Sequence, residues 1–496
     1  MKKVCWPYFD PEFENFTERI HGPSCRVCID NESFEDCTIV KVDSVNKQGL
    51  LLQVVQALTE MNLFISKSYI SSDAEWFMDV FHVTDEHGNK LTDQNVINRI
   101  QQVIAKRKDP RDSSQVKSGA GTGRENTGEH TAIELTGTDR PGLFSEISAV
   151  LKDLKCNVVE AHAWSHNERL ACVAYISDQS TDSPIDDPRR LATIEEHLAT
   201  VLGATINGSG THDEQGVKTA GLPPPGGSIN GITTTNVERR LHQLMFAGRD
   251  FDGPPANASL SALPSPAEGE EERNKKIIVT IESCNEKRYS VVTVECKDRP
   301  KLMFDTVCTL TDMQYVIFHA SISPHGDSAF QEYYIRHING CPLNTESEKQ
   351  RVIKCLEAAL ERRVCEGVRL KLCANNRIGL LSDITRLLRE YGLAVVRADV
   401  ETQGEKAVDA FYVRDISGNE VDMKIVESMK REMEALALEV KNEPSSHRRS
   451  SPERPPFCFS FGDILKSQIE RFSHHFIPIK WTKNAVRQPH ILTLLY

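Results

Sequence analysis

The chain has 496 residues, with 59 lysines and arginines against 71 aspartates and glutamates, and a formal net charge of −12. Its length allows about three or four domains, and its 14 cysteines are too sparse for a disulfide scaffold, which favours a reducing compartment. No stretch of about 18 apolar residues occurs, so we expect no transmembrane segment, and the absence of a secretory signal favours a cytoplasmic location. Because the chain has no excess of basic residues, we expect no nucleic-acid partner.

Four segments of the chain share one register. They align without a gap when four anchor residues are superimposed: Gly49, Gly142, Lys301 and Gly379. Leu follows each anchor after one and after nine residues, a spacing that fits one face of a helix. β-branched residues, which favour strands, follow after sixteen and after thirty-four residues: Ile65, Val158, Ile317 and Val395, then Val83, Ile176, Ile335 and Val413. The chain therefore contains one structural unit four times.

Each unit predicts the same elements in the same order. A strand precedes each anchor: Thr38–Val45, Ala132–Thr136, Tyr289–Cys296 and Val368–Ala374. A helix of about three turns follows, and then a hairpin, which in the second unit joins Asn157–Trp164 to Arg169–Ser177. A second amphipathic helix closes the pattern: Val96–Lys106, Leu191–Leu202, Glu346–Arg362 and Val421–Leu436. Only the fourth unit shows its final strand in the sequence, at Ala437–Val440.

This order predicts an α+β fold of tandem ferredoxin-like βαββαβ modules joined by flexible linkers. The expected repeats span residues 38–107, 131–203, 288–363 and 367–441. The linkers at 108–130 and 204–275 are rich in Gly, Ser and Pro, a composition that buries too little apolar surface to order itself. Within the second linker, Asn236–Phe246 predicts a short helix, which either docks on a unit or stays transient and solvated.

Residues 442–496 form a C-terminal tail. Its segment Ser445–Ser451 combines arginines with serines, which suits phosphorylation, an acidic membrane or a nuclear importer as well as a plain polar loop. The nucleus is therefore a second compartment to consider beside the cytoplasm.

The turn between the first strand and the first helix is the candidate binding element. It opens with Asn or Asp in every unit, followed by a basic residue. The side-chain oxygen can cap the helix, proline suits a first helical position, and glycine allows a small partner to approach the backbone. The exposed N–H groups and the helix dipole can hold a carboxylate, while the Asn or Asp oxygen can accept from an ammonium group.

A free α-amino acid carries both of these groups, so the candidate ligand-binding residues come from the four turns: Asn46, Lys47 and Gly49; Asp139, Arg140, Pro141 and Gly142; Asp298 and Arg299; Asn376, Arg377 and Gly379. A simple helix start would explain each turn equally well. The basic second residue is not required for capping, and it favours anion recognition. Lys301 replaces the glycine in the third unit and makes close backbone approach doubtful there.

The units resemble ACT domains, and the whole chain resembles the plant ACT-domain-repeat proteins of the ACR family. The similarity rests on three turn segments, Asp139–Glu146, Asp298–Phe304 and Asn376–Asp383, with support from Glu238–Gln243 and from stretches between Phe459 and His474. It implies ACT modules that pair within the chain or across a homodimer and bind amino acids where they meet. It also implies a sensing role like that of the ACT repeats in bacterial uridylyltransferases.

Other motifs give little support for a metal, a cofactor or catalysis. Cys25 and Cys28 have zinc-ligand spacing, but no second Cys or His pair follows at a suitable distance. Gly119–Gly123 neither follows a strand nor opens a helix, so it does not indicate a nucleotide site. His162 and His166 flank a predicted hairpin turn without a recurring nucleophile. We expect no metal site, no cofactor and no catalytic residues.

Four units and two linkers leave no stretch of ~100 residues for a catalytic domain. The sequence therefore favours a non-enzymatic sensor that binds a free amino acid at module interfaces and signals to a protein partner. A ligand-independent interaction scaffold is the main alternative, and an enzyme with a hidden site is a third. The identities of the amino acid and of the protein partner do not follow from the sequence.

Overall fold

The computed structural model describes residues 25–45, 49–72, 76–106, 130–203, 216–220, 234–253, 277–284, 286–364, 368–417 and 421–439. Within them the first unit comprises β1 (Cys25–Asp30), β2 (Thr38–Val45), α2 (Leu50–Glu60), β3 (Phe64–Ser72), β4 (Trp76–Thr84) and α3 (Gln94–Lys106). The third unit repeats this order with β9 (Ile278–Cys284), β10 (Tyr289–Lys297), α8 (Leu302–Asp312), β11 (Tyr315–His325), β12 (Ser328–His337) and α9 (Glu346–Glu361).

The second unit comprises β5 (Thr131–Thr138), α4 (Leu143–Asp153), β6 (Cys156–His166), β7 (Arg169–Asp178), α5 (Pro188–Leu202) and β8 (Gly216–Ala220). The fourth comprises β13 (Val368–Asn375), α10 (Leu380–Glu390), β14 (Leu393–Gln403), β15 (Lys406–Asp415) and α11 (Met423–Glu439). The helix α6 (Thr234–Ala247) and a short 3-10 turn, η3 (Asp250–Asp252), lie between the second and third units in the chain. The antiparallel strands and the order of helices confirm the predicted fold class.

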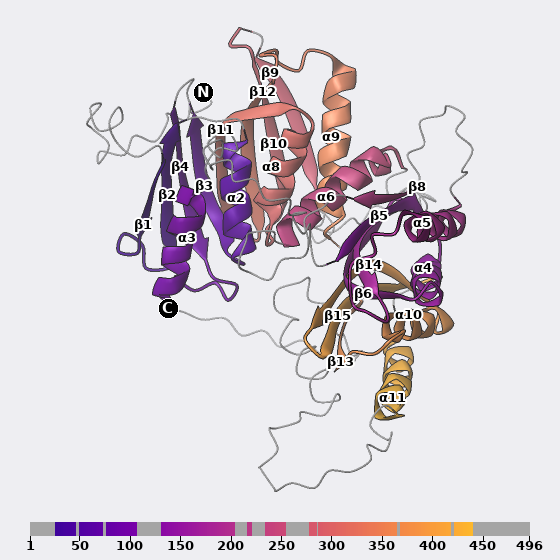
Figure 1. Ribbon diagram of the computed structural model, residues 1–496. Coiled ribbons are helices and arrows are strands. Elements are labelled where there is room, and N and C mark those ends of the chain that lie inside the picture. The colour runs from indigo at the N-terminus through magenta and orange to yellow at the C-terminus, as the bar shows by residue number, and fades with distance from the viewer. Residues whose placement is uncertain are drawn as a thin grey trace, which may run out of the picture.

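The units pair within one chain, the first with the third and the second with the fourth (Figure 1). An eight-stranded sheet has the order β1-β2-β4-β3-β11-β12-β10-β9, and a seven-stranded sheet has the order β13-β15-β14-β6-β7-β5-β8. The seams are antiparallel: Ile70 of β3 lies opposite Ala320 of β11, and Ala163 of β6 lies opposite Ala398 of β14. One apolar core fills each pair of units, so neither unit of a pair closes its core alone.

The position of the edge strand differs among the units. In the second unit the edge strand is β8, which follows the last helix of the unit. The first and third units take it from the segment before their first strand, as β1 and β9. The predicted final strand at Ala437–Val440 is wrong, because residues 437–439 continue α11, and residue 440 lies outside the described residues. Ala, Leu and Glu are strong helix formers, and this propensity explains the longer helix.

The helix α6 sits between the two sheets (Figure 1). Its buried residues Val237, Leu241, Leu244 and Met245 pack on Trp164 and its neighbours on the open face of the second sheet. Of the two predicted alternatives for Asn236–Phe246, the structure shows the docking helix. These four residues are spaced at i, i+4, i+7 and i+8, which places them on one face of the helix. Packing of this face on the sheet stabilises a helix that is only marginally long enough to form alone.

The predicted linker at 204–275 is therefore only partly a linker. It also contributes β8, because a short strand at a sheet edge is stabilised by the backbone hydrogen bonds of its neighbour β5. The predicted linker at 108–130 and the tail at 442–496 lie outside the described residues, except for residue 130. In the part of the chain that is described, no helix combines the length and the apolar character needed to cross a bilayer.

Candidate functional site

The four turns share one backbone geometry. Gly49, Gly142 and Gly379 have φ of 79°, 83° and 77°, and Lys301 has φ of 65°. In the second unit, Leu143 N donates to Arg140 O at 3.0 Å, which closes a type II turn with Pro141 and Gly142 at its centre. The positive φ favours glycine, although Lys301 adopts the same conformation in the third unit.

Predicted helix capping by Asn or Asp is wrong. Each first helix begins directly after its anchor residue, and the anchor is the N-cap without any side-chain hydrogen bond. Pro141 precedes the N-cap and is not the first helical residue. The Asp139 carboxylate instead accepts a hydrogen bond from Ser165 Oγ, and burial raises the pKa of Asp139.

The basic residue of the turn is paired inside its own unit. Arg140 Nη1 donates to Glu146 Oε1 at 2.8 Å, and the third and fourth units repeat this pair as Arg299–Asp305 at 2.8 Å and Arg377–Asp383 at 2.7 Å. The acid always lies four residues after the anchor, on the first turn of the helix. The basic residue therefore has a structural partner, and its presence alone no longer indicates an anion ligand. Asn46 and Lys47 lie outside the described residues.

The third turn is filled by the chain itself. Lys301 Nζ lies 2.9 Å from Glu238 Oε1 of α6, and Arg363 Nη1 lies 3.0 Å from the same oxygen. Burial opposes ionisation of Glu238, but Arg363, Lys301 and Arg397 lower its pKa to about 2. Arg299 also donates to Leu360 O at 3.1 Å. Arg299 is thus held by partners within the chain, and ligand binding by Asp298 and Arg299 stays a prediction.

Glu238 belongs to a buried ionic cluster, which we define as Glu238, His242, Asp250, Asp305, Arg362 and Arg363. Arg363 Nη2 lies 2.7 Å from Asp305 Oδ1, and Arg362 Nη2 lies 2.6 Å from Asp250 Oδ1. His166 Nδ1 of β6 lies 2.9 Å from Asp250 Oδ2, so this histidine, for which no catalytic role was predicted, is an interface residue. The cluster joins α6 to the third unit and to the second sheet.

The second and fourth turns face each other's units. A Cβ added at Gly142 would lie 2.7 Å from Arg389 Cδ of α10, and one added at Gly379 would lie 2.6 Å from Lys152 Cε of α4. Lys152 and Arg389 each lie ten residues after their anchors, so the two contacts are related by the pseudo-symmetry of the pair. At the centre of this seam, the hydroxyl oxygens of Ser148 and Thr385 lie 2.7 Å apart.

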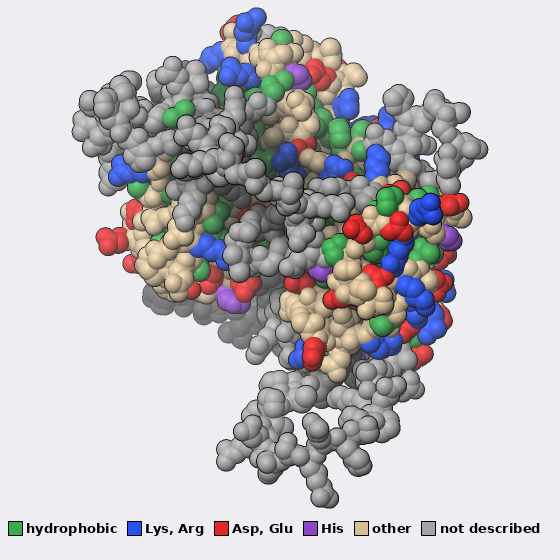
Figure 2. Space-filling view, in the orientation of Figure 1, with side chains coloured by type: hydrophobic (Ala, Val, Ile, Leu, Met, Phe, Trp, Pro, Cys, Tyr) green, Lys and Arg blue, Asp and Glu red, His purple; other side chains and the backbone are tan. Residues whose placement is uncertain are grey.

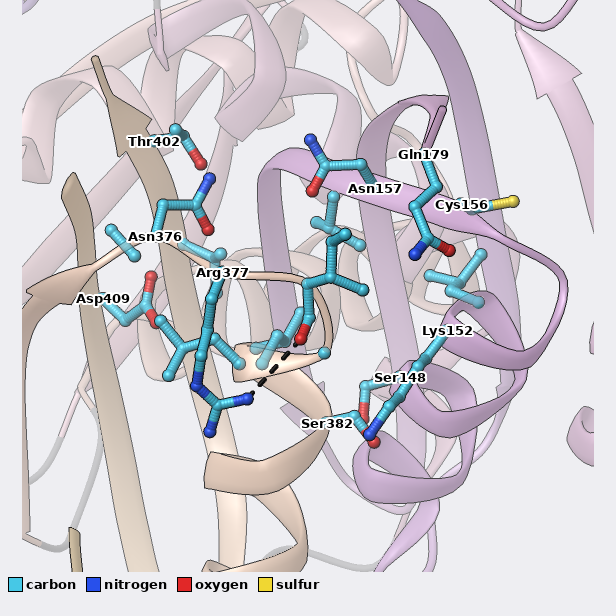
Figure 3. A pocket seen from close by; sticks show the side chains of 18 residues that line it. Ser148, Lys152, Cys156, Asn157, Gln179, Asn376, Arg377, Ser382, Thr402 and Asp409 are labelled. Atoms are coloured by element: carbon cyan, nitrogen blue, oxygen red, sulfur yellow. Dashed lines mark hydrogen bonds between the residues drawn. The ribbon is translucent and has the colours of Figure 1, made fainter. Parts of the chain in front are cut away.

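The fourth turn lines a cleft between the second and fourth units, with a volume of about 530 Å³ that includes the part open to solvent. Figure 3 shows Asp409, Asn376 and Thr402 on one side of it, and Asn157, Gln179 and Lys152 on the other. We call this space the inter-unit cleft. It brings Asn376, Arg377 and Gly379 together with side chains of α4 and β6, whereas the second turn is not part of its lining.

Asp409 is the most unusual side chain of the cleft. It is 2% exposed, and its Oδ1 has no hydrogen-bond partner among the described residues. Burial raises its pKa to about 7, despite a backbone N–H from Glu401. A buried, unsatisfied carboxylate is costly, and a cation placed against it would offset that cost.

Lys152 provides the opposite charge. Its Nζ lies beside the turn at Gly379 and 3.4 Å from Asp383 Oδ1. It is close to the N-terminus of α10, where backbone N–H groups lack helical partners. The cleft therefore combines a buried acid with a positively charged helix start, an arrangement suited to a zwitterion. Mixed charges also cover the helices of this half of the molecule (Figure 2).

Neither Asp409 nor Lys152 was predicted as a site residue. A signal for Asp409 was present, because it interrupts a strand pattern between Ala407 and Phe411 where the second unit has Cys172. The first unit has Asp79 at the same register, fully buried, with neither carboxylate oxygen bonded within the described region. The described residues contain no group of three or more His, Cys, Asp or Glu side chains that could hold a metal ion.

Comparison with known proteins identifies the units. The family model for the ACR family N-terminal ACT domain matches residues 33–110, and ACT domain models match residues 129–206 and 290–357. The chain is 60% identical to ACT domain-containing protein ACR2 of Arabidopsis thaliana, over 97% of this chain and 100% of that protein. It is 51% identical to ACR3 of the same plant, over 90% of this chain and 94% of that protein.

Proposed function

This chain belongs to the ACR family of plant ACT-domain proteins, and on that premise we propose that it is a non-enzymatic regulatory protein that binds a free α-amino acid in the inter-unit cleft. The single observation that supports this most is Asp409, a buried carboxylate whose Oδ1 has no partner among the described residues. An α-ammonium group would satisfy it. The ligand carboxylate would then lie against Lys152 and the start of α10.

The energy required is modest. Sensing a ligand at millimolar concentration needs about 4 kcal/mol of binding free energy. Hydrogen bonds to charged groups contribute about 1.5–3 kcal/mol each, so two or three of them suffice before ordering costs. A shallow polar cleft can therefore serve, and the polar side chains of Asn157, Gln179 and Thr402 would select among amino acids.

The strand β14 offers a route for the signal. Val400 and Thr402 line the cleft, and Arg397 and Asp399 alternate with them on the opposite face of the strand. Arg397 Nη2 lies 4.0 Å from Glu238 Oε1 and 2.9 Å from Asp399 Oδ2. A ligand that shifts β14 would thus reach the ionic cluster and α6. A change in α6 would alter the surface presented to a protein partner, provided that the ligand prefers one arrangement.

Calorimetry with the full chain and each common amino acid at millimolar concentration tests this function. We expect heat and a thermal shift for at least one amino acid, and Asp409→Asn abolishes both. Asp79→Asn is the matched control, because it changes a buried aspartate at the same register of the first unit. The proposal fails if the wild-type chain gives neither heat nor a thermal shift with any amino acid.

A ligand-independent scaffold is the second candidate, favoured by the internal ion pairs of the turn arginines and by the filling of the third turn. It predicts that partner capture from cell extract is unchanged by amino acids. We also propose that the protein acts in the cytoplasm, with the nucleus as a second compartment, which fluorescent tagging of the full chain would test.

A further inference from the structure

The helix α6 is held on two sides by different kinds of contact. Its apolar residues pack on Trp164 and other residues of the second sheet. Toward the third unit it makes ion pairs: Glu238 pairs with Lys301 at the third turn, and Arg239 pairs with Asp312 of α8. Added ions weaken ion pairs but not apolar contacts. The side of α6 that faces the third unit is therefore the side that a charged ligand can release.

The Glu238 carboxylate is surrounded by cations from three parts of the chain. Lys301 Nζ lies 2.9 and 3.0 Å from its two oxygens, and Arg363 Nη1 donates to Oε1 at 3.0 Å. Arg397 Nη2 of β14 lies 4.0 Å from the same oxygen. The two arginines each pair with one further carboxylate. Together these groups form a carboxylate-binding site, and its occupant in this structure is a side chain of the same chain.

The position of Lys301 indicates that its charge has a role. Its φ of 65° is a conformation that favours glycine, which the other three units have at this position, so a lysine here is costly. The Lys301 side chain is 24% exposed, whereas that of Glu238 is 3% exposed. A free ligand would thus meet the lysine from the solvent side, although the carboxylate of Glu238 is covered.

The third unit lacks the acid that an amino acid would need. Gln331 of β12 stands at the register of Asp409, and it is uncharged and 1% exposed. Its Oε1 accepts a hydrogen bond from Tyr333 Oη at 2.7 Å, so it has a partner within the chain. An ammonium group beside Lys301 would meet cations in place of an acid. The third turn therefore suits a carboxylate that carries no ammonium group.

We propose that the third turn is a binding site for an organic carboxylate without an ammonium group, and that Glu238 is its internal competitor. When a free carboxylate pairs with Lys301 and Arg363, Glu238 is released, and α6 loses this contact with the third unit. The apolar face of α6 stays on the second sheet. This site differs from the inter-unit cleft in both position and ligand, so neither site depends on the other.

Thermal unfolding of the full-length Glu238→Ala variant tests the site. Acetate replaces the carboxylate that this change removes, and it should raise the melting temperature by about 3 °C or more over sodium chloride at equal ionic strength. Glycine, which adds an ammonium group to acetate, should not. Asp312→Ala is the matched control, because it removes another acid that binds α6, and acetate should not stabilise it. Equal effects of acetate, glycine and chloride on Glu238→Ala would overturn the proposal.

Hydrogen exchange in the wild-type chain tests the competition without relying on that variant. Peptides covering α6 should exchange about threefold faster or more in acetate than in sodium chloride of the same ionic strength, because Glu238 is displaced. Lys301→Gly, which introduces the residue of the other three turns, should abolish this response. Equal exchange of the wild-type chain in the two salts would show that no free carboxylate competes with Glu238. An undiminished response in Lys301→Gly would place the carboxylate elsewhere, and either result overturns the proposal.

Discussion

Lys301 Nζ lies 2.9 Å from Glu238 Oε1, so an acidic side chain of α6 occupies the turn that opens the third unit. The carboxylate pairs with the side chain of the residue that stands where the other three turns have glycine. The chain thus keeps one turn closed by its own residue, while the fourth turn opens onto the inter-unit cleft. This difference between two copies of one unit separates a structural turn from a candidate binding turn.

Replacing Glu238 tests the structural role of the closed turn. Glu238→Gln leaves Arg363 and Lys301 short of a negative partner in a buried place, and we expect a loss of about 3 kcal/mol in the free energy of unfolding. Urea unfolding measures it, and Glu286→Gln on the surface should change it by less than about 0.5 kcal/mol. A loss as small as that of the control would mean that the ionic cluster contributes nothing to stability.

The pH dependence of this stability has a defined sign. The pKa of Glu238 falls from 4.5 to about 2 on folding, because its positive partners outweigh burial. The contribution is therefore complete above pH 4.5 and is lost as the pH falls toward 2. Glu238→Gln should flatten the stability profile in that window, and an unchanged profile would contradict the assignment.

Asp79 should have the opposite effect. Burial raises its pKa well above 3.8, so the folded state retains a proton that the unfolded state releases. Stability should therefore decrease as the pH rises above 3.8, by about 1.4 kcal/mol per unit while the proton is retained. Asp79→Asn should lower this slope by about 1.4 kcal/mol per pH unit in urea titrations between pH 4 and pH 7, where the buried Asp409 contributes a slope of its own. The exposed Asp186→Asn should leave the slope as in the wild-type chain. An equal slope in the two variants would exclude Asp79 as a source.

The sequence predicted the elements better than their partners. Strand and helix positions followed from local periodicity, as in Thr38–Val45, which matches β2 residue for residue. The source of each edge strand did not, because pairing at an edge depends on segments far away in the chain. For the same reason Asp409 looked like one polar residue in a strand, and only the packing of the second unit against the fourth gave it a cleft.

In the turns, too, the positions were predicted from the sequence but the side-chain partners were not. Their glycines were predicted as special positions because a small partner can approach the backbone there, and the structure shows a second reason, which is the positive φ that these turns require. From the sequence, the repeated arginines suggested anion recognition. Their acidic partners lie on the following helix, at positions that the sequence also allows to be exposed to solvent, so the ion pairs were not predicted. Pairing of Arg140 with Glu146 follows from the turn geometry, which only the structure reveals.

Ligand affinity should rise with pH. Only the ionised Asp409 attracts an ammonium group, and its pKa of about 7 means that the ionised fraction rises between pH 6 and pH 8. We expect amino-acid binding to be about tenfold tighter at pH 8 than at pH 6. Calorimetry at both values measures this change. Equal affinity at both pH values would show that Asp409 does not hold the ammonium group.

Gly379→Ala tests whether the fourth turn contributes to ligand affinity as well as to stability. The positive φ of 77° should cost about 1 kcal/mol of stability, and the new methyl group would displace Lys152, which lies 2.6 Å from that position. Amino-acid affinity should therefore fall together with stability. In Gly88→Ala, φ is also positive at 81° but nothing lies within 4 Å, so it should cost stability alone. Unchanged affinity in Gly379→Ala would remove Lys152 from the site.

A crystal of the full chain soaked in mixed amino acids tests the central claim most directly. We expect density for one amino acid in the inter-unit cleft, with its ammonium group against Asp409 and its carboxylate beside Lys152 and Gly379. The third turn should remain closed by Glu238. An empty inter-unit cleft, or an amino acid bound only at another turn, would contradict the account.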